Sequence, residues 1–376
     1  MAGIYIHIPF CKMACNYCNF HFSTSLHYKN EFVAALLNEI QMQQQNNYLN
    51  SSAIETIYFG GGTPALLAVD ELERIMNQLQ QNFNIHANAE ITLEANPDDV
   101  TDAKLIAWKQ LGINRLSIGI QSLFDEDLQW MNRVHNAAQA KQVFSMARTA
   151  GFDNFTVDLI YGIPGLTDEK WEYNINWVLE QGITHLSCYA LTVEPNTPLH
   201  KLIRTQQKQD VDAAQQSRQF IQLMDTMEHK GWEHYEISNF AKPGHRSRHN
   251  SAYWQGVPYL GLGPSAHSFN GSSRQWNVAN NQQYIRALNE NNIPFEAEEL
   301  TTTQQLNEYI MTSLRLMEGC NLDVITKKFG SDKAEQLQRE AERYLHLQWM
   351  KQENKHLILT REGKLFADRI AGDLFF

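Results

Sequence analysis

Cysteine is scarce in this sequence, and the few cysteines present are unevenly placed. Only five occur among 376 residues, and three of them, Cys11, Cys15 and Cys18, lie close together near the amino terminus. An odd number of cysteines clustered in this way does not fit the disulfide framework of a small secreted protein. The pattern indicates a metal site.

Positive charge is also in deficit. The chain has 31 Lys and Arg residues against 42 Asp and Glu residues, which gives a formal net charge of −11. A negative field repels phosphodiester backbones, and no local basic cluster is present to overcome that repulsion. The basic clusters of an amphipathic membrane anchor are missing too. The sequence therefore predicts no nucleic acid partner.

No segment has the features of a signal peptide or a transmembrane helix. Residues 1–9 lack a basic leading region, and their apolar run is too short for a signal peptide. Residues 249–273 contain no Asp, Glu, Lys or Arg, but their repeated glycine and proline exclude a spanning helix. We predict a cytoplasmic protein in which residues 249–273 form a buried or ligand-lining loop.

The composition otherwise fits a folded globular chain. Hydrophobic residues make up 43% of the sequence and charged residues 19%, so a large core can form and the fibrous and disordered classes are excluded. The length exceeds that of one ordinary domain. One large domain with a smaller satellite is expected.

The first half of the chain alternates between strand-like and helix-like segments. Strands are predicted at residues 4–8, 53–59, 90–94, 115–119, 155–160 and 185–190. Helical segments are predicted between them at residues 28–44, 69–82, 101–111, 124–150 and 168–180. Six successive units of this kind predict an α/β fold with a parallel sheet closed into a barrel or partial barrel. An open doubly wound sheet is the alternative.

The second half of the chain does not continue the regular alternation of strands and helices. A helix at residues 211–230 and a strand at 233–237 predict an extension of the sheet that covers the barrel mouth. From about Thr301, three helices, a hairpin turning at Asn354 and a final helix from Arg361 predict a winged-helix-like module. We therefore expect a partial barrel over residues 1–230, a sheet extension with lining loops over 231–295, and a small C-terminal domain over 296–376.

The three clustered cysteines carry the chemistry. Their spacing is Cys11-x3-Cys15-x2-Cys18, and they follow the first strand, where the first loop of a barrel opens onto the functional face. Three thiolates can hold three irons of a [4Fe-4S] cube and leave the fourth iron open to another ligand. The alternative is a zinc knuckle with His21 as the fourth ligand.

The cysteine motif, placed after Tyr-Ile-His-Ile-Pro-Phe at residues 5–10, resembles the signature of the radical SAM superfamily. Residues 59–64, Phe-Gly-Gly-Gly-Thr-Pro, resemble the family's glycine motif, in which backbone close to the methionine amine needs residues without side chains. The resemblance implies a partial (β/α)6 radical SAM barrel and a [4Fe-4S] cluster. In this family the open iron is chelated by S-adenosylmethionine (SAM), whose reductive cleavage gives a 5′-deoxyadenosyl radical.

A closer similarity, which runs nearly end to end, is to oxygen-independent coproporphyrinogen oxidase and its relative, the heme chaperone HemW. By this resemblance the positions that contact SAM are Tyr5, Gly61, Gly62, Thr63, Glu94, Gln121, Arg133, Asp158, Ala190 and His267. Tyr17, between two cluster cysteines, belongs to the same site. Most of these positions stand at the ends of predicted strands, which meet on one face of a barrel.

The sequence also predicts the environment of two of these positions, Asp158 and Arg133. Asp158 lies among apolar residues in a strand buried on both faces, so its carboxylate needs a partner. A ribose hydroxyl or Arg133 would serve. The contacts of Arg133 and Asp158 are expected at the nucleoside end of SAM, away from iron.

Two departures separate this chain from the oxidase. The oxidase pattern is CxxxCxxCxC, whereas Phe20 stands here at the fourth cysteine, and the oxidase carries a substantial arm before its first strand, which begins here near Ile4. In addition, residues 249–254, His-Asn-Ser-Ala-Tyr-Trp, resemble the HNxxYW motif of the heme chaperones. The resemblance implies that His249 is an axial ligand of heme iron, with His245 as the nearest competitor.

The sequence thus supports a heme chaperone that binds heme and a SAM-ligated [4Fe-4S] cluster and transfers heme to an acceptor hemoprotein. The alternative is an oxygen-independent coproporphyrinogen III oxidase, against which Phe20 argues. Whether the chain is an enzyme stays open at this point. The two remaining cysteines are expected to be structural, Cys188 as a buried apolar side chain and Cys320 at a helix end.

Overall fold

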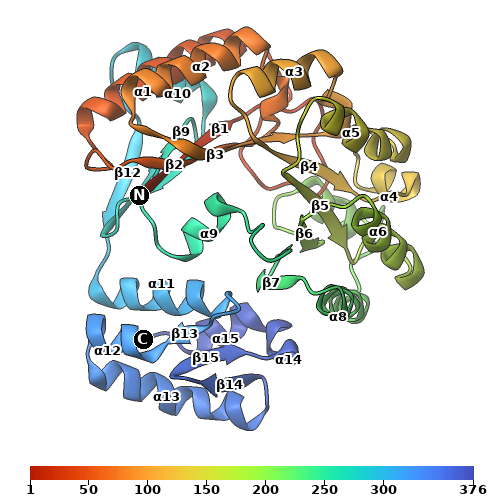
Figure 1. The fold of residues 1–376 in the computed structure, drawn as a ribbon, viewed down its shortest axis with the longest axis vertical. Helices are drawn as coiled ribbons and strands as arrows, with labels where there is room; N and C mark the ends of the chain where they lie inside the picture. The colour runs from red at the N-terminus through yellow and green to blue at the C-terminus, as the bar shows by residue number, and fades with distance from the viewer.

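A curved sheet of twelve strands runs through the larger part of the molecule (Figure 1). The computed structural model describes residues 1–376. Six consecutive strands are parallel, each paired with the next in chain order. They are β1 (Ala2–Ile8), β2 (Ile54–Gly61), β3 (Ile85–Ala95), β4 (Arg115–Gln121), β5 (Phe155–Tyr161) and β6 (His185–Ala190). A doubly wound sheet would reverse its strand order at a switch point, so the partial (β/α)6 barrel is confirmed and the open alternative is wrong.

Helices cover the outer face of these strands (Figure 1). They are α1 (Lys29–Asn46), α2 (Val69–Asn82), α3 (Asp102–Gln110), α4 (Asp125–Trp130), α5 (Ala137–Thr149) and α6 (Asp168–Glu180), with short 3-10 turns at Pro64–Leu66 and Pro97–Asp99. Side-chain caps from Thr101, Asn136 and Thr167 begin α3, α5 and α6. The helical stretch expected at 124–150 is divided into α4 and α5.

The sheet extends beyond the barrel at both edges. Next to β6 lie β8 (Asn239–Ala241) and β7 (Glu233–Glu236), and next to β1 lie β9 (Tyr259–Leu262), β10 (His267–Phe269), β11 (Ser273–Asn277) and β12 (Phe295–Glu299). The intervening helices are α7 (Pro198–Arg204), α8 (Ala213–His229), α9 (Arg248–Trp254) and α10 (Asn281–Asn289).

The prediction that residues 249–273 form a loop is wrong. The segment contains most of α9, all of β9 and β10, and the first residue of β11. β9 pairs in parallel with Gly3 to Ile6 of β1, and Leu260 and Leu262 are fully buried. This uncharged segment therefore forms short strands and one short helix, which are separated by glycine turns. It lacks charged residues because much of it is buried in the sheet.

The C-terminal part forms a smaller body with its own core (Figure 1). Its elements are α11 (Thr302–Leu314), β13 (Cys320–Asn321), α12 (Leu322–Phe329), α13 (Ser331–His346), β14 (Met350–Glu353), β15 (His356–Leu359), α14 (Arg361–Lys364) and α15 (Ala367–Asp373). Seventeen buried residues form a cluster separate from that of the barrel. The helices α11, α12 and α13, the hairpin of β14 and β15 and the helices after Arg361 follow the predicted order of elements, and β13 completes a three-stranded antiparallel sheet.

The two isolated cysteines have different surroundings from each other. Cys188 is buried on β6, as predicted. Cys320 is also buried, but it pairs with Leu357 across β13 and β15, so its assignment to a helix end is wrong. Two residues of strand after Gly319 are too short to give a sequence signal.

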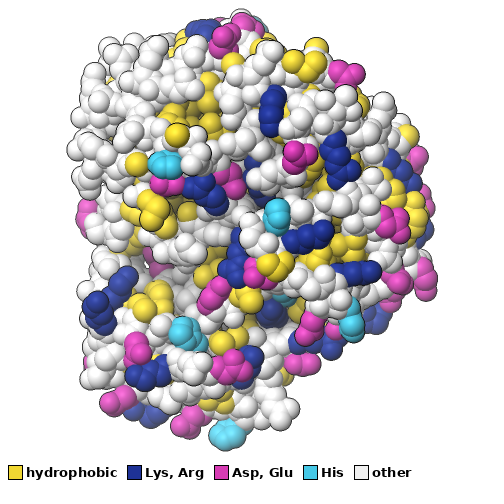
Figure 2. Space-filling model, viewed as in Figure 1, with side chains coloured by type: hydrophobic (Ala, Val, Ile, Leu, Met, Phe, Trp, Pro, Cys, Tyr) yellow, Lys and Arg dark blue, Asp and Glu magenta, His cyan; other side chains and the backbone are white.

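The surface shows mixed charge. On the face seen in Figure 2, acidic and basic side chains are interspersed, and no large area of one sign is present. None of the helices combines the length and the apolar character that crossing a bilayer requires.

Candidate functional site

The inner face of the six parallel strands is polar. On β1, Ile4, Ile6 and Ile8 are fully buried in the main apolar cluster, whereas the alternate residues Tyr5 and His7 point inward and contact each other, with Tyr5 Oη 3.2 Å from His7 Nδ1. Inward-facing residues of the other strands include Thr56, Tyr58, Glu90, Glu94, Arg115, Ser117, Thr156, Asp158, His185 and Ser187. A barrel of this kind is usually filled with branched apolar side chains. A polar interior instead favours a ligand site.

The three clustered cysteines lie on the irregular loop between β1 and α1, and all are partly exposed free thiols. Backbone contacts hold the loop at both ends: Cys11 N–H donates to Ser23 O at 3.0 Å, and Asn16 N–H donates to Met131 O at 3.1 Å. Burial raises the pKa of the Cys11 thiol to about 11, against the hydrogen bond from Thr63, and charge on Cys18 and Cys15 adds to the rise. Within the motif, Cys18 N–H donates to Cys15 O at 3.3 Å, so these two cysteines lie in one turn of the loop.

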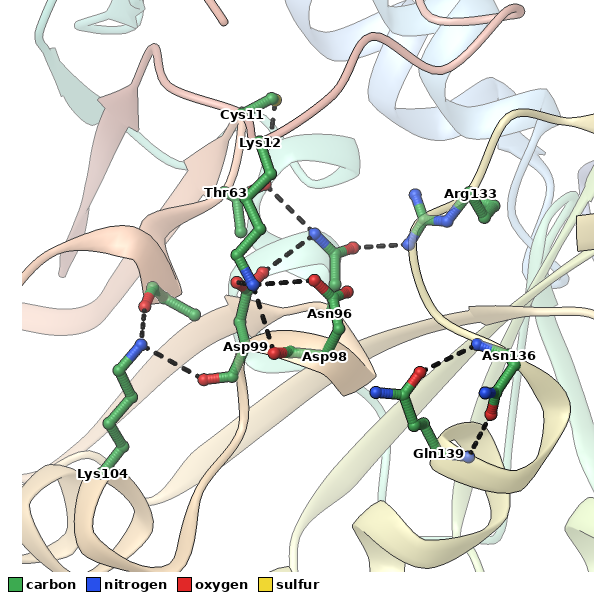
Figure 3. A network of polar contacts seen from close by, with 11 residues as sticks. Cys11, Lys12, Thr63, Asn96, Asp98, Asp99, Lys104, Arg133, Asn136 and Gln139 are labelled. Carbon is green, nitrogen blue, oxygen red and sulfur yellow. Dashed lines mark hydrogen bonds and ion pairs between the residues drawn. The ribbon is translucent and has the colours of Figure 1, made fainter. Parts of the chain in front are cut away.

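A chain of hydrogen bonds connects two of these cysteines, and Figure 3 shows the part of it that runs from Cys11 through Thr63 and Asn96 to Arg133. Thr63 Oγ1 donates to Cys11 Sγ at 3.7 Å, and Asn96 Nδ2 donates to Thr63 Oγ1 at 3.2 Å. Arg133 donates from one amino group to Asn96 Oδ1 at 2.5 Å and from the other to Cys15 Sγ at 3.4 Å. Donors aimed at sulfur stabilise a thiolate ligand.

Arg133 therefore lies beside a cluster cysteine. Its position on the loop after α4 brings the guanidinium to Cys15, and the expected contact of Arg133 with the nucleoside end of SAM stays a prediction. Sequence reasoning missed Asn96 as the link. The signal was its place immediately after the third strand, at the barrel end where the cysteine loop also lies.

The zinc knuckle alternative receives no support from His21. His21 Nε2 lies 2.7 Å from Asn281 Oδ1, and the backbone oxygen of His21 lies 2.8 Å from His7 Nε2. No three His, Cys, Asp or Glu side chains converge on a point where a single metal ion would sit. The cysteines of a [4Fe-4S] cube bind three different irons and need no such convergence. The loop therefore fits the cube better than it fits tetrahedral zinc.

The glycine motif brings bare backbone against the cysteine loop. Gly62 N–H donates to Ile8 O at 2.8 Å, and a Cβ atom at Gly62 would lie 2.6 Å from Phe10 O. Gly61 has φ of +103°, and a Cβ atom there would lie 2.6 Å from His7 Nδ1. A side chain at Gly62 would therefore displace the backbone at Ile8 and Phe10, and one at Gly61 would displace the His7 ring and strain the backbone of Gly61.

Two carboxyl groups stand inside the barrel. Tyr58 Oη donates to Glu94 Oε1 at 2.7 Å, and burial is the main reason that the pKa of Glu94 is raised to about 8. Burial raises the pKa of Asp158 to about 6, opposed by hydrogen bonds from Ser187 and Ser117. Asp158 thus has serine partners, with Ser117 Oγ at 3.3 Å. Of the two partners that the sequence left open, Arg133 forms no ion pair with Asp158, and a ribose hydroxyl stays a prediction.

Unpartnered polar atoms mark the same region. Gln121, at the end of β4, has φ of +66°, and its Oε1 atom is buried without a hydrogen-bond partner. Arg133 Nε is also buried and unpartnered. The unpaired acceptor of Gln121, the unpaired donor of Arg133 and the buried carboxylate of Asp158 together fit a polar ligand that carries positive charge, such as SAM.

The remaining predicted SAM residues are less tightly grouped. Ala190 ends β6, as expected, and Tyr17 packs against the main apolar cluster beside the cysteine loop. His267 lies outside the six parallel strands, exposed at the start of β10, with its ring stacked on Trp276 at 6.1 Å between centroids.

His249 lies at the opposite end of the barrel from the cysteine loop. Its Nδ1 atom is 2.8 Å from Thr56 Oγ1, near the start of β2, and its Nε2 atom is 3.0 Å from Tyr253 Oη. The side chain is 2% exposed and stacks on Tyr58 at 5.0 Å. In this conformation neither ring nitrogen is free to bind a metal. The competing His245 is exposed on the loop before α9.

Comparisons with protein families agree with this geometry. Residues 5–178 match the radical SAM superfamily, and residues 300–366 match the HemN C-terminal domain. A protein of Bacillus subtilis named heme chaperone HemW is 33% identical over 380 residues, covering 99% of this chain and 98% of that protein. The protein of the same name from Synechocystis is 34% identical, covering 84% of this chain and 78% of its own length.

A solved structure shares the whole fold. The solved structure of Escherichia coli coproporphyrinogen III oxidase, HemN, described as a radical SAM enzyme, superposes with a TM-score of 0.85, and the match covers 100% of this chain and 90% of that one. Its sequence identity is 23%. This likeness establishes the architecture of barrel, extension and C-terminal body.

Proposed function

Because the chain belongs to the HemW family of heme chaperones within the radical SAM superfamily, we propose that it binds heme and transfers it to an acceptor hemoprotein. The observation that carries this proposal is the similarity, at about a third identity over nearly the full length, to relatives named heme chaperones. The oxidase shares the fold at a lower identity of 23%. Similarity of fold alone does not specify function.

We propose that Cys11, Cys15 and Cys18 hold a [4Fe-4S] cluster whose open iron binds SAM. Bound in this way, the pair would supply a site for one-electron chemistry. Thr63 and Arg133 would stabilise two of the sulfur ligands by hydrogen bonds, and Gly61 and Gly62 let the end of β2 pack directly against β1 and the cysteine loop. The polar barrel interior, with Glu94 and Asp158, would receive the nucleoside and cationic parts of SAM.

Phe20 supports the chaperone over the oxidase. It occupies the place of the fourth cysteine in the oxidase pattern, and its ring is 66% exposed on the cysteine loop. An exposed aromatic side chain cannot supply a thiol to the chemistry, but it offers apolar contact to a partner or a porphyrin. We propose that the loop tip contacts cargo or acceptor.

A paired assay tests the proposal. The anaerobically prepared protein should bind about one heme per chain in a spectroscopic titration and should pass it to an apo-hemoprotein. The same preparation should not decarboxylate coproporphyrinogen III in the presence of SAM and a reductant. Turnover to protoporphyrinogen would favour the oxidase, whatever the heme titration shows.

The raised pKa of Glu94 predicts that SAM binding depends on pH. Pairing with the positive charge of SAM requires the ionised carboxylate, and the group is mostly protonated below its pKa of about 8. Affinity should therefore rise as pH increases from 6.5 toward 8.5, by up to about tenfold per pH unit below the pKa, with proton release on binding. Calorimetry in buffers of different ionisation enthalpy measures both effects.

The variant Glu94→Gln tests whether the negative charge of Glu94, and not the size of its side chain, causes the pH dependence of SAM binding. It keeps the side-chain size and an acceptor for Tyr58, so the cluster content should match wild type. Its affinity for SAM should be lower at pH 8.5 and nearly independent of pH. Retention of the full pH dependence in Glu94→Gln would assign the titration to another group, such as Asp158.

A further inference from the structure

Asn96 lies between the two side chains that donate hydrogen bonds to the clustered cysteines (Figure 3). It follows β3 directly, and its backbone is extended, with φ of −94° and ψ of 151°, as the residue before Pro97 favours. The Asp99 backbone N–H donates to Asn96 O at 2.9 Å and fixes the turn after the strand. This held backbone directs the Asn96 amide toward Thr63 and Arg133.

The direction of each hydrogen bond follows from the chemistry of the partners. A guanidinium can only donate, so Arg133 must face the amide oxygen of Asn96, which lies 2.5 Å away. The amide nitrogen therefore faces Thr63 Oγ1 at 3.2 Å and Asp99 Oδ2 at 3.3 Å, both of which accept. Because Thr63 Oγ1 accepts from the amide, its own hydrogen is left to point at Cys11 Sγ, 3.7 Å away.

The same amide holds the donor to the second cysteine. One amino group of Arg133 donates to Asn96 Oδ1 and to Gly119 O at 3.0 Å, and the other amino group lies 3.4 Å from Cys15 Sγ. A Cβ atom at Gly119 would lie 3.3 Å from the guanidinium and 3.4 Å from Asn96 Oδ1. A glycine at this position of β4 therefore leaves room for the contact between Arg133 and Asn96.

An ion pair anchors this network to the cysteine loop. Asp99, which accepts the second amide hydrogen of Asn96, is 3% exposed and pairs with Lys12 at 2.5 Å. Lys12 follows Cys11 in the chain and also pairs with Asp98 at 2.8 Å. The amide of Asn96 is thus bonded to a donor for each of two cysteines and to a carboxylate that holds the loop itself.

We propose that Asn96 is a positioning residue, which sets the direction of the hydrogen bonds to Cys11 and Cys15 and thereby the reduction potential of the cluster that these cysteines hold. This inference rests on the proposed [4Fe-4S] cluster and concerns its tuning. Reduction adds negative charge to a cluster, and donors to its sulfur ligands stabilise that charge, so their loss makes the potential more negative. Asn96 needs no contact with iron or SAM for this role.

Replacing the amide by a carboxylate reverses one of these hydrogen bonds. In Asn96→Asp the new carboxylate can only accept, so it takes the Thr63 hydroxyl hydrogen away from Cys11, and it pairs with the Arg133 guanidinium more strongly than an amide does. We expect at least a tenfold fall in the ratio of reduced to oxidised cluster at a given applied potential. For one electron this is a shift of about 59 mV toward negative potential.

Electron paramagnetic resonance of the full-length protein, loaded with its cluster without oxygen and poised at a series of potentials in the absence of SAM, measures the midpoint. Asn96→Ala removes the amide without adding charge, and it should shift the midpoint in the same direction by a smaller amount. Iron analysis and circular dichroism check that each variant holds the cluster and is folded.

Asn114→Ala is the matched control. Asn114 also makes two side-chain hydrogen bonds, donating from Nδ2 to Ala89 O at 2.8 Å and accepting at Oδ1 from Ile91 N–H at 2.9 Å. Both partners are backbone groups of β3, and neither contacts a cysteine. This variant should therefore keep the wild-type potential even if it loses some stability.

A double-mutant cycle with Thr63→Val tests whether Asn96 acts through the hydroxyl of Thr63. Valine keeps the shape of threonine but cannot donate to sulfur, whereas Thr63→Ser keeps the donor and should keep the wild-type potential. The shift caused by Asn96→Asp should be at most half as large in the Thr63→Val background, because the bond to Cys11 is already lost. A shift of the same size in both backgrounds would show that the added charge acts directly, and would overturn the positioning role.

The outcomes separate this inference from the proposal on which it rests. If wild type carries no iron–sulfur cluster, the proposed cluster fails. If wild type carries the cluster and both Asn96 variants keep its potential, the cluster stands and the role of Asn96 is overturned. If a folded Asn96 variant loses its iron, the pair Thr63→Val and Thr63→Ser decides instead, and equal potentials in these two variants would overturn the inference.

Discussion

A variant in which Cys11, Cys15 and Cys18 are all replaced by alanine should purify without bound iron, whereas wild type prepared without oxygen should carry about four irons per chain. The reason is that these thiols lie on one loop, and that two of them, Cys11 and Cys15, accept hydrogen bonds from Thr63 and Arg133. Iron and acid-labile sulfide analysis, with the visible absorption of the cluster, measures the loss.

The two other cysteines provide matched controls. Cys188 and Cys320 are buried in the two separate cores and lie far from the loop in sequence. Cys188→Ala and Cys320→Ala should keep the full iron content, with a small loss of stability from lost packing. Iron retained in the triple variant, or zinc as the native metal, would contradict the cluster assignment.

The barrel was predictable because its signals are local and repeated. Each of the six parallel strands is a short apolar run followed by a segment with helical periodicity, and β1, β2 and β6 begin or end within a residue or two of the expected bounds. β3 begins five residues earlier than expected, at Ile85, because the exposed stretch before Glu90 has no apolar pattern. The cysteine motif was predictable because its spacing is specific.

The sheet extension was not predictable from local pattern. β9 joins β1 across more than 250 residues of sequence, and β10 to β12 are short strands whose pairing depends on that contact. A segment of this kind resembles a loop in sequence because glycine and proline turns interrupt it every few residues. The stacking of His267 on Trp276 arises from this long-range pairing, and the sequence alone could not bring the two rings together.

The local environment of His249 could not be predicted from the sequence either. The motif at residues 249–254 identifies a relationship, but motif spacing does not show whether a ring nitrogen is free. In the structure, α9 turns His249 toward Thr56 and Tyr253, so the same histidine that suggests a ligand in the sequence is a hydrogen-bonded core residue. Partners from β2 and α9 decide its chemistry.

A buried glutamate holds the extension to the barrel, and its removal is the second large expected effect. Glu39 of α1 is 0% exposed. Its carboxylate accepts hydrogen bonds from Tyr284 Oη at 2.6 Å, Asn277 Nδ2 at 2.6 Å and the Gly263 backbone N–H at 2.8 Å. These donors come from α10, β11 and the turn after β9, which are three parts of the extension.

Glu39→Ala should lower the free energy of unfolding by about 3–5 kcal/mol, because three buried donors lose their acceptor at roughly 1–3 kcal/mol each and water reaches some of them. Chemical denaturation monitored by circular dichroism measures the change. Glu39→Gln keeps part of the network and should lose less. Gln41→Ala, on the exposed side of the same helix, should stay within about 0.5 kcal/mol of wild type.

The ionisation of Glu39 gives the prediction a second readout. Burial raises the pKa of Glu39 in the folded state, against the hydrogen bonds from Tyr284, Gly263 and Asn277. A carboxyl whose pKa is raised on folding binds more protons folded than unfolded, so its contribution to stability declines as pH rises through the folded pKa. Glu39→Gln cannot ionise and should lack this decline.

The prediction fails if Glu39→Ala and Gln41→Ala are equally stable at all pH values. That result would show that the hydrogen bonds of the Glu39 carboxylate are dispensable, and that apolar contacts such as those of Leu260 and Leu262 hold the extension to the barrel.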